Sequence, residues 1–191
     1  MNDASASLDP PLRVDWLGPD GEPERVGLTI LPGKHGNSAR YPGRVYRRDV
    51  ERDLATLVEL EVRHLILLVE DSELQRWGNL DIVERGSIAG VQIHRFPMVD
   101  GGTPRDLGEM QEILDTIRLG RRDGNVAVAC MGGVGRTGMV AACHLVERGT
   151  APRDAIATVR AVRHPEAVET HAQEQFVLRY AELNEAAPRR P

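Results

Sequence analysis

Hydrophobic and polar positions follow two rhythms along this chain, and each rhythm predicts one kind of element. Residues 64–70 and 125–129 are aliphatic runs, typical of strands buried on both faces of a sheet. In residues 49–61 apolar side chains recur every three or four positions, which predicts an amphipathic helix. Strand and helix patterns alternate, so we expect an α/β fold with a largely parallel central sheet flanked by helices.

The same patterns, with the turn residues between them, place the other elements. Further strands are predicted at residues 12–17, 25–31 and 91–96. Two short helices, with breaks at Gly78 and Gly86, are predicted within residues 71–90. Four more helices are predicted, one starting at Pro104 behind a Thr103 cap and the others at residues 136–148, 152–163 and 167–185.

Length and local composition indicate one domain. A chain of 191 residues can bury a core, and we expect the domain at residues 12–185, between a disordered tail at 1–11 and a frayed tail at 186–191. The chain has no apolar run long enough to span a membrane, and its first residues lack the basic and apolar regions of a secretory signal. We therefore expect no membrane contact.

Cysteine count and charge narrow the compartment and the partners. Two cysteines in 191 residues argue against a disulfide scaffold and favour a reducing, cytoplasmic compartment. The formal net charge of −5 disfavours a nucleic-acid partner. The six histidines show no zinc-ligand spacing with the cysteines, so we expect neither a metal nor another cofactor.

The most informative stretch joins the strand at 125–129 to the helix at 136–148. It holds Cys130, then five residues, then Arg136, and the five are Met131, Gly132, Gly133, Val134 and Gly135. The glycines allow successive backbone N–H groups to turn inward around a small anion, and the helix adds the positive end of its dipole. A thiol in that position favours the thiolate and is a nucleophile at neutral pH. Because Arg136 can also bind two phosphate oxygens through its planar guanidinium, the stretch predicts attack on a phosphate monoester.

A second element lies upstream, where that chemistry requires a proton donor. Attack of a thiolate on phosphorus expels an alkoxide or phenoxide, so a positioned acid must supply a proton. Asp100, in the turn-rich loop at 97–104, is the candidate. Alone, Asp-Gly-Gly is ordinary turn chemistry, but beside the Cys-x5-Arg loop it predicts the acid.

A nucleotide-binding loop is the sharpest competing interpretation. The general form of that motif has Gly where Cys130 stands and Lys where Arg136 stands, and its Mg²⁺-binding acidic strand follows the loop. Here the candidate acidic pair, Glu70 and Asp71, precedes the loop. A buried cysteine, a tight turn and a solvated arginine each explain one part of the pattern, but not the combination.

The Cys-x5-Arg-Thr-Gly sequence resembles the signature loop of protein tyrosine and dual-specificity phosphatases. Residues 97–104, Pro-Met-Val-Asp-Gly-Gly-Thr-Pro, resemble the acid loop of the kinase-associated phosphatase group, the cyclin-dependent kinase inhibitor 3 family. Weaker matches at 31–33, 160–163 and 167–170 extend the resemblance over residues 12–182. A composition rich in Ala, Arg and Val favours a bacterial member, so a cyclin-dependent kinase substrate is not carried over.

The resemblance implies a dual-specificity-phosphatase-like fold and a role for each residue of the motif. Cys130 would be the nucleophile that forms a phosphocysteine intermediate, and Asp100 the acid and then the base. Arg136 and the amides of residues 131–136 would bind the phosphoryl oxygens without a metal. Thr137 would stabilise the thiolate when it leaves.

Two positions depart from the family pattern. Ala129 stands where a His usually precedes the nucleophile, which predicts an altered pH–rate profile and not a loss of activity. Glu169 stands where many relatives carry a Gln that orients the hydrolytic water. Gln173, four residues on, would share a helical face with Glu169 and is the second candidate for that role. Solvated helix surface stays the alternative for both residues.

Several basic residues are expected to be ordinary surface. Five of them lie among glycines and prolines near the N-terminus and fit a solvated loop better than a substrate-attracting rim: Lys34, Arg40, Arg44, Arg47 and Arg48. Arg160 and Arg163 are expected to be a surface pair.

Three functions stay open on the sequence. The first is a phosphoprotein phosphatase of tyrosine or dual specificity. The second is the same chemistry on a small phosphoester such as a phosphoinositide, a sugar phosphate or a nucleotide, because fold does not settle substrate. The third is a catalytically weak phosphate-binding module, which would not need Asp100. Rhodanese-like sulfur transfer also uses a Cys-and-Arg loop, but Asp100 and Thr137 favour phosphate.

Overall fold

The computed structural model describes residues 9–18, 25–38, 41–77 and 79–186, and within them a five-stranded sheet forms the centre of the molecule. The strands, in spatial order, are β1 (Asp15–Leu17), β2 (Val26–Ile30), β7 (Asn125–Cys130), β5 (Val62–Leu67) and β6 (Gln92–Arg95). β1 pairs antiparallel with β2, and all other neighbours are parallel. The predicted α/β fold with a largely parallel sheet is therefore confirmed.

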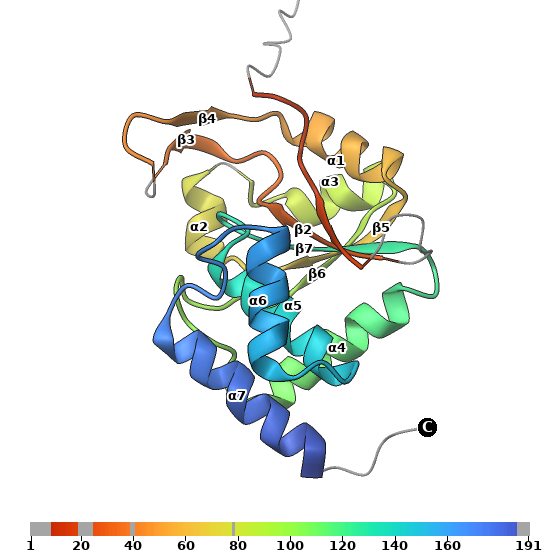
Figure 1. Ribbon diagram of the computed structural model, residues 1–191. Helices are drawn as coiled ribbons and strands as arrows, with labels where there is room; N and C mark the ends of the chain where they lie inside the picture. The colour runs from red at the N-terminus through yellow and green to blue at the C-terminus, as the bar shows by residue number, and fades with distance from the viewer. Residues whose placement is uncertain (1–8, 19–24, 39–40, 78, 187–191) are drawn as a thin grey trace, which may run out of the picture.

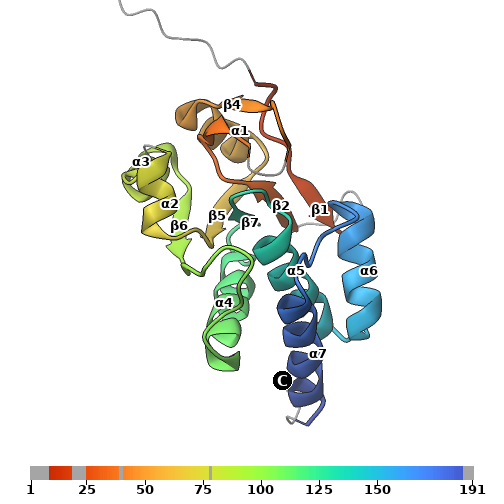
Figure 2. The ribbon, with the colours of Figure 1, turned by 90° about the vertical axis from the view of Figure 1, so that its left-hand side faces the viewer.

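Helices cover both faces of the sheet. They are α1 (Val50–Glu59), α2 (Asp71–Arg76), α3 (Ile82–Ala89), α4 (Leu107–Gly120), α5 (Gly135–Glu147), α6 (Pro152–Val162) and α7 (His171–Ala186). Figures 1 and 2 show α1 and α3 on one side of the sheet and α4 to α7 on the other. Within the described part of the chain, no helix is long and apolar enough to cross a membrane.

The central strands and α5 make the core. β5 and β7 bury Leu65, Ile66, Val126 and Val128 completely, as expected for strands covered on both faces. α5 is buried along almost its whole length because it lies between the sheet and the outer helices α6 and α7.

Local chemistry moves some predicted boundaries. Asp106, not Thr103, caps α4, because its carboxylate accepts a hydrogen bond from the N–H of Glu109 at 2.9 Å. Gly86 does not break a helix. It lies inside α3, where a Cβ would stand 2.5 Å from Ile93, so the glycine permits close packing of α3 on β6.

Two further differences concern the ends of the chain. α7 starts at His171, later than predicted, because Val168 has a φ of 60°, which the helix cannot continue through. Asp9 and Pro10, predicted within a tail, receive hydrogen bonds from Arg47 and Arg48. Gly78 and residues 1–8 and 187–191, which carry the other predictions on breaks and tails, lie outside the described residues.

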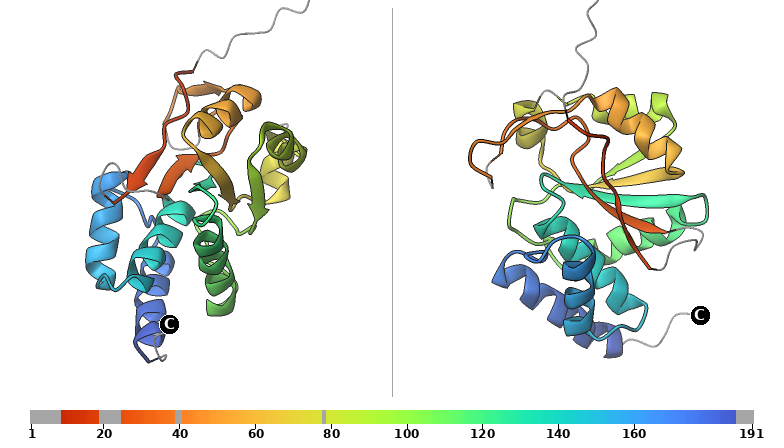
Figure 3. Two further views of the ribbon diagram at one scale, coloured as in Figure 1. Left: turned by 90° about the vertical axis from the view of Figure 1, so that its right-hand side faces the viewer. Right: turned by 45° about the horizontal axis from the view of Figure 1, so that its top comes forward.

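A small hairpin was not predicted at all. β3 (His35–Asn37) and β4 (Val45–Arg47) pair antiparallel and extend from the sheet above α2 (Figures 1 and 3). Gly36 of the hairpin stands against Trp77, which ends α2, where a Cβ would be 2.4 Å from the ring. These strands are too short for a period-two pattern to show in the sequence.

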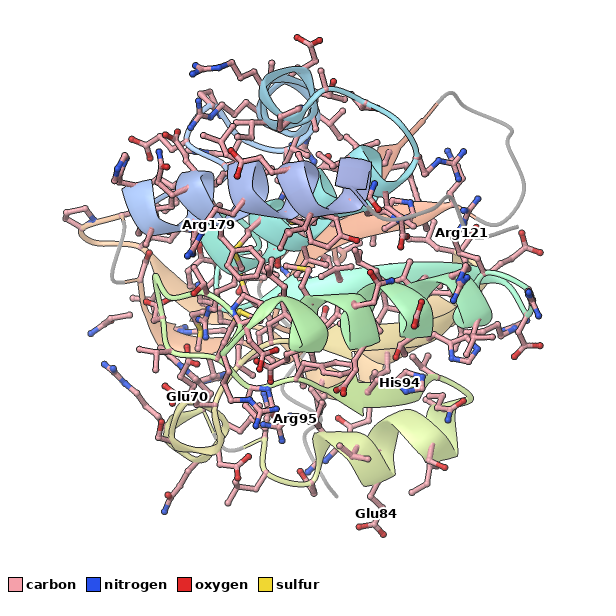
Figure 4. All side chains as sticks on the ribbon, turned by 90° about the horizontal axis from the view of Figure 1, so that it is seen from below. Glu70, Glu84, His94, Arg95, Arg121 and Arg179 are labelled. Atoms are coloured by element: carbon pink, nitrogen blue, oxygen red, sulfur yellow. The ribbon has the colours of Figure 1, made fainter. Side chains whose placement is uncertain are left out.

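The carboxyl ends of the parallel strands meet at one edge of the sheet. β2, β5, β6 and β7 all run toward this edge, and Ile30 is paired in register with Cys130. In Figure 4 the labelled Glu70, which precedes α2, and Arg95, the last residue of β6, lie on the α2 side of the molecule, whereas Arg121, after α4, lies toward the opposite side. The segments that follow these strands are therefore neighbours in space, as is usual for binding sites in parallel sheets.

Candidate active site

Cys130 is the last residue of β7, and the loop after it leads directly into α5. The chain turns sharply there because Gly133 has a φ of +64°. A Cβ on Gly133 would stand 2.3 Å from the carbonyl oxygen of Thr29, so glycine is required at this position. Cys130 is 3% exposed.

Arg163 braces the loop from outside. Its Nε donates to the carbonyl oxygen of Gly133 at 2.8 Å and its Nη2 to that of Gly132 at 3.3 Å. An ion pair with Asp15 at 2.6 Å fixes the guanidinium. Since the N–H and C=O of one peptide point in opposite directions, the N–H groups that follow these two carbonyls point away from Arg163, as an anion-binding loop requires. The expectation that Arg163 is a surface residue was wrong.

Arg136 lies in the first turn of α5 and is 1% exposed. Glu73 of α2 accepts from Nη1 at 2.7 Å and from Nη2 at 2.8 Å, a bidentate pair. The carbonyl oxygen of Met98 accepts from Nη1 at 2.8 Å. Asp100 accepts from Nη2 at 2.8 Å, so two carboxylates share one guanidinium.

These contacts shift the pKa values of the pair. Burial opposes the charge of Arg136, but the hydrogen bonds that it donates to Glu73 and the neighbouring negative charges raise its pKa above the ordinary value. Burial likewise opposes ionisation of Glu73, yet its hydrogen bonds with Arg136 and with the N–H of Glu70 lower its pKa. Both groups are charged at neutral pH, and Glu73 orients Arg136.

Two buried polar atoms at the site have no hydrogen-bond partner within the described residues. They are Nε of Arg136 and Oγ1 of Thr137, next to each other at the start of α5. A buried donor without a partner costs free energy, about 1–3 kcal/mol, unless a ligand supplies the acceptor. The arrangement therefore suits an anion above Cys130.

Asp100 stands on the loop after β6, with a side chain that is 76% exposed. Thr170, directly before α7, and Gln173, in its first turn, hold this loop in place. Thr170 donates a hydrogen bond to the carbonyl oxygen of Gly101, and Gln173 donates one to that of Gly102, each at 2.9 Å. Gln173 is fully buried, so solvated helix surface was the wrong alternative for it. Its amide oxygen accepts from the N–H of Glu169 at 2.9 Å.

Glu169 reaches back toward the Cys130 loop. It precedes α7, so it does not share a helical face with Gln173 as predicted. Its carboxylate oxygen lies 2.8 Å from the position that a Cβ on Gly135 would occupy. The carboxylate therefore stands over the start of α5, although the residue is exposed.

Residues 42–177 match the family described as Swiss Army Knife protein, DSP-PTPase phosphatase domain, which is more than half of the chain. The chain belongs to this family. The phosphatase is also 26% identical to cyclin-dependent kinase inhibitor 3 of Rattus norvegicus and of Homo sapiens, over 172 residues. These matches cover 87% of this phosphatase and 77% of each relative. The protein is a protein-tyrosine-phosphatase-type hydrolase.

Solved structures of other phosphatases share its fold. Kinase associated phosphatase, with its catalytic cysteine replaced by serine, superposes with a TM-score of 0.79 at 23% identity, over 94% of this chain and 99% of that one. Tk-PTP in the active form has a TM-score of 0.66 at 29% identity, over 83% and 92%. PTPMT1 in complex with PI(5)P has a TM-score of 0.65 at 21% identity, over 84% and 92%.

The structure adds residues that the sequence prediction missed. Glu73 was not singled out, although a carboxylate shortly after a buried parallel strand lies at the edge where sites form. Arg163 lies in the weakly matching segment 160–163 but was assigned to the surface, because its partners are backbone carbonyls about 30 positions away in the sequence. Lys34 and Arg48, expected in a solvated loop, are 5% and 7% exposed, so that expectation was wrong for them.

Proposed function

We propose that this phosphatase hydrolyses phosphate monoesters of phosphoproteins, with tyrosine or dual specificity, through a phosphocysteine intermediate. The observation that carries the proposal is that Arg136 lies close to Cys130 in the sequence and contacts Asp100 in the structure. It contacts the carboxylate of Asp100 at 2.8 Å from a helix that begins five residues after Cys130. One small anion above the thiol can therefore meet a nucleophile, a cation and an acid.

In the first step the Cys130 thiolate attacks phosphorus while the bond to the leaving oxygen breaks. The inward N–H groups of residues 131–136 and Nε of Arg136 hold the phosphoryl oxygens, and their charge is stabilised in the transition state. Protonated Asp100 gives its proton to the leaving alkoxide or phenoxide. The products are the free alcohol and a phosphocysteine.

In the second step a water attacks the phosphocysteine. The Asp100 carboxylate takes a proton from that water, phosphate forms, and the electron pair of the P–S bond returns to sulfur. The hydroxyl of Thr137 donates a hydrogen bond to the leaving thiolate. Glu169, over the start of α5, is the proposed water-orienting residue, while Gln173 holds the acid loop through its amide.

A small phosphoester is the second candidate substrate. PTPMT1, whose structure holds PI(5)P, supports it, since it shares the fold. Phosphoprotein substrates have the support of the family that residues 42–177 match. The two classes are separated by comparing kcat/KM for phosphotyrosine and phosphothreonine peptides with that for soluble phosphoinositides at equal concentration.

The test of the chemistry is hydrolysis of an aryl phosphate in excess EDTA by wild type and Cys130→Ser. We expect turnover that is lost completely in the variant. Acid quenching of wild type during turnover, followed by intact-mass measurement, should trap a phosphate adduct on Cys130. Turnover that survives in Cys130→Ser would overturn the proposal, and so would turnover without any adduct on sulfur in wild type.

A further inference from the structure

Lys34 is the single lysine among the 24 lysine and arginine residues of the chain. It follows β2 by four residues, and the end of β2 is in register with Cys130, so the backbone brings Lys34 to the carboxyl edge of the sheet. Its side chain is nearly buried. A chain whose other Lys/Arg positions are all arginine thus has one compact, readily deprotonated ammonium at the sheet edge where Cys130 lies.

A buried polar network holds the turn that carries Lys34. The carboxylate of Asp53 accepts from the N–H of Gly33 at 2.8 Å and forms a bidentate pair with Arg48 at 2.7 and 2.8 Å. Asn79 donates to the carbonyl oxygens of Pro32 and Gly33 at 3.2 and 3.0 Å. These three polar side chains are each less than 9% exposed. The turn is therefore far more constrained than an ordinary surface loop.

The ammonium of Lys34 has no carboxylate partner among the described residues. It lies 4.0 Å from the ring centroid of Tyr46, and the guanidinium of Arg44 lies 4.7 Å from the same centroid. Burial lowers the pKa of Lys34 to about 8, while the negative charges of Cys130 and Asp100 raise it and Arg44 lowers it. Lys34 is thus close enough to the nucleophile and the acid to interact with their charges.

The charge balance at the site calls for such a cation. Arg136, the cation at the end of the Cys130 loop, is shared between the carboxylates of Glu73 and Asp100. A phosphate dianion that approaches a thiolate therefore meets negative charge that Arg136 alone does not compensate. We propose that Lys34 is the second cation of the phosphate site and that its ammonium draws the substrate dianion onto Cys130.

This role rests on the proposed function for its substrate, but attraction of an anion to Cys130 can be measured without turnover. Iodoacetate and iodoacetamide alkylate the same thiolate, and only iodoacetate carries a negative charge. The ratio of their rates at Cys130 therefore cancels ionisation and accessibility of the thiol and reports the local charge. Cys143 does not interfere, because it is fully buried and burial raises its pKa.

The variants are Lys34→Met, which keeps the length without the charge, and Lys34→Arg, which keeps the charge. Arg85→Met, on α3, removes an equal charge away from the site. We expect the iodoacetate-to-iodoacetamide ratio to fall about tenfold in Lys34→Met and to stay near wild type in the other two, since local charge changes such rates by about 10-fold or more. The Ki of inorganic phosphate should rise in Lys34→Met by a similar factor.

The pH dependence of the ratio gives an independent signature. In wild type it should fall as pH rises through about 8, where Lys34 loses its proton. It should stay flat there in Lys34→Met, and also in Lys34→Arg, which stays charged. The ionisation of Cys130 cancels in the ratio of the two alkylation rates. Asp100 and Arg44 are present in both wild type and Lys34→Arg, so a difference between the two pH profiles reports the titration of Lys34.

An unchanged ratio in Lys34→Met, with the same pH profile as wild type, would overturn the proposal and leave Lys34 a packing residue under Tyr46. If Lys34→Met does not fold, Lys34→Gln is the second neutral variant, and the same drop in ratio is expected. A ratio that depends on Lys34 in a protein without phosphatase activity would overturn the proposed function and keep the anion site. Phosphatase activity together with a ratio that does not change in Lys34→Met would keep the proposed function and overturn the role of Lys34.

Discussion

Asp100 and Arg136 form an ion pair with an oxygen-to-nitrogen distance of 2.8 Å between Oδ1 and Nη2. The pair joins the proposed acid to the proposed phosphate-binding residue before any substrate is present. Glu73 accepts hydrogen bonds from both terminal nitrogens of the same guanidinium, so Arg136 keeps its orientation when its ion pair with Asp100 breaks. A phosphate that binds at Nη2 must therefore displace Asp100, which frees that carboxyl to meet the leaving oxygen.

Asp100→Asn should separate catalysis from binding. The variant cannot donate a proton, so kcat for substrates with poor leaving groups should fall by about 10²–10⁴-fold. Aryl phosphates with strongly acidic phenols need no proton and should lose much less. The measurement is kcat across a series of aryl phosphates, plotted against leaving-group pKa.

Binding of inorganic phosphate provides the contrast in the same variant. Because Asn removes the negative charge that competes for Arg136, its Ki for phosphate should equal that of wild type or be lower. An increase in Ki together with a uniform loss of kcat across the series would show that Asp100 only supports the loop structure.

Glu73→Gln should disturb Arg136 without touching the substrate. The amide keeps one acceptor and loses the charge, so the guanidinium keeps its place less firmly, and small misplacements cost up to about 10²-fold in rate. We expect kcat/KM to fall by about that factor and the unfolding free energy by about 1–3 kcal/mol. Urea unfolding and aryl phosphate kinetics measure both, with Glu84→Gln on α3 as a matched control.

The stability difference between wild type and Glu73→Gln should depend on pH in one direction. The folded pKa of Glu73 is lowered from 4.5, so its contribution is complete above that value and is lost as pH falls through the folded pKa. The two unfolding curves should therefore converge in acid. A gap that stays constant from pH 7 down to pH 3 would mean that the charge of Glu73 is not what stabilises the fold.

A structural feature of this protein could be predicted from the sequence when the residues that form it lie close together along the chain. Aliphatic runs and helical periodicity act locally, and they placed β5, β7, α1 and α5 within a few residues. The loop from Cys130 to Arg136 could be singled out because one short segment supplies the proposed nucleophile, the glycines and the cation. Asp100 was singled out because the chemistry proposed for that loop requires a proton donor.

Contacts between distant segments were the part that sequence could not supply. Glu73 and Arg136 are 63 positions apart in the sequence, and Gln173 and Gly102 are 71 apart. Glutamate and glutamine are common on protein surfaces, so residue type alone did not mark Glu73 or Gln173 as part of the site. Arg163 and Lys34 were expected at the surface because charged side chains usually lie there. Their burial depends on backbone carbonyls and on a turn that only the folded sheet brings together.

Gly133→Ala should abolish activity for a steric reason. Its φ of +64° and the 2.3 Å approach of a Cβ to the carbonyl oxygen of Thr29 leave no room for a side chain, so the loop must shift. Gly43→Ala is the matched control, since Gly43 has a φ of +81° but nothing within 4 Å of its Cβ. We expect Gly43→Ala to lose only about 1–2 kcal/mol of stability and to keep its kcat. Equal kcat values in the two variants would contradict the loop geometry.

His144 should make the fold sensitive to mild acid. It lies on α5 at 6% exposure, its Nδ1 has no hydrogen-bond partner within the described residues, and burial, helped by Arg121 and Arg148, lowers its pKa to about 4. Between that value and 6.5 the unfolded chain binds a proton that the folded protein does not. The unfolding free energy should therefore fall as pH drops from 6.5 to 4, by about 3 kcal/mol in all, and His144 should cost nothing above 6.5.

His144→Gln removes the titrating group and should flatten this part of the pH–stability curve, as measured by urea unfolding at half-unit intervals. His171→Gln, at an exposed position on α7, should keep the wild-type slope. The comparison separates one buried imidazole from the general effect of acid on a chain with many carboxylates, because the latter is common to all three proteins. If the slope between pH 6.5 and 4 were the same in His144→Gln as in wild type, the imidazole would have to accept a proton inside the folded core, and the packing around α5 would be looser than its burial indicates.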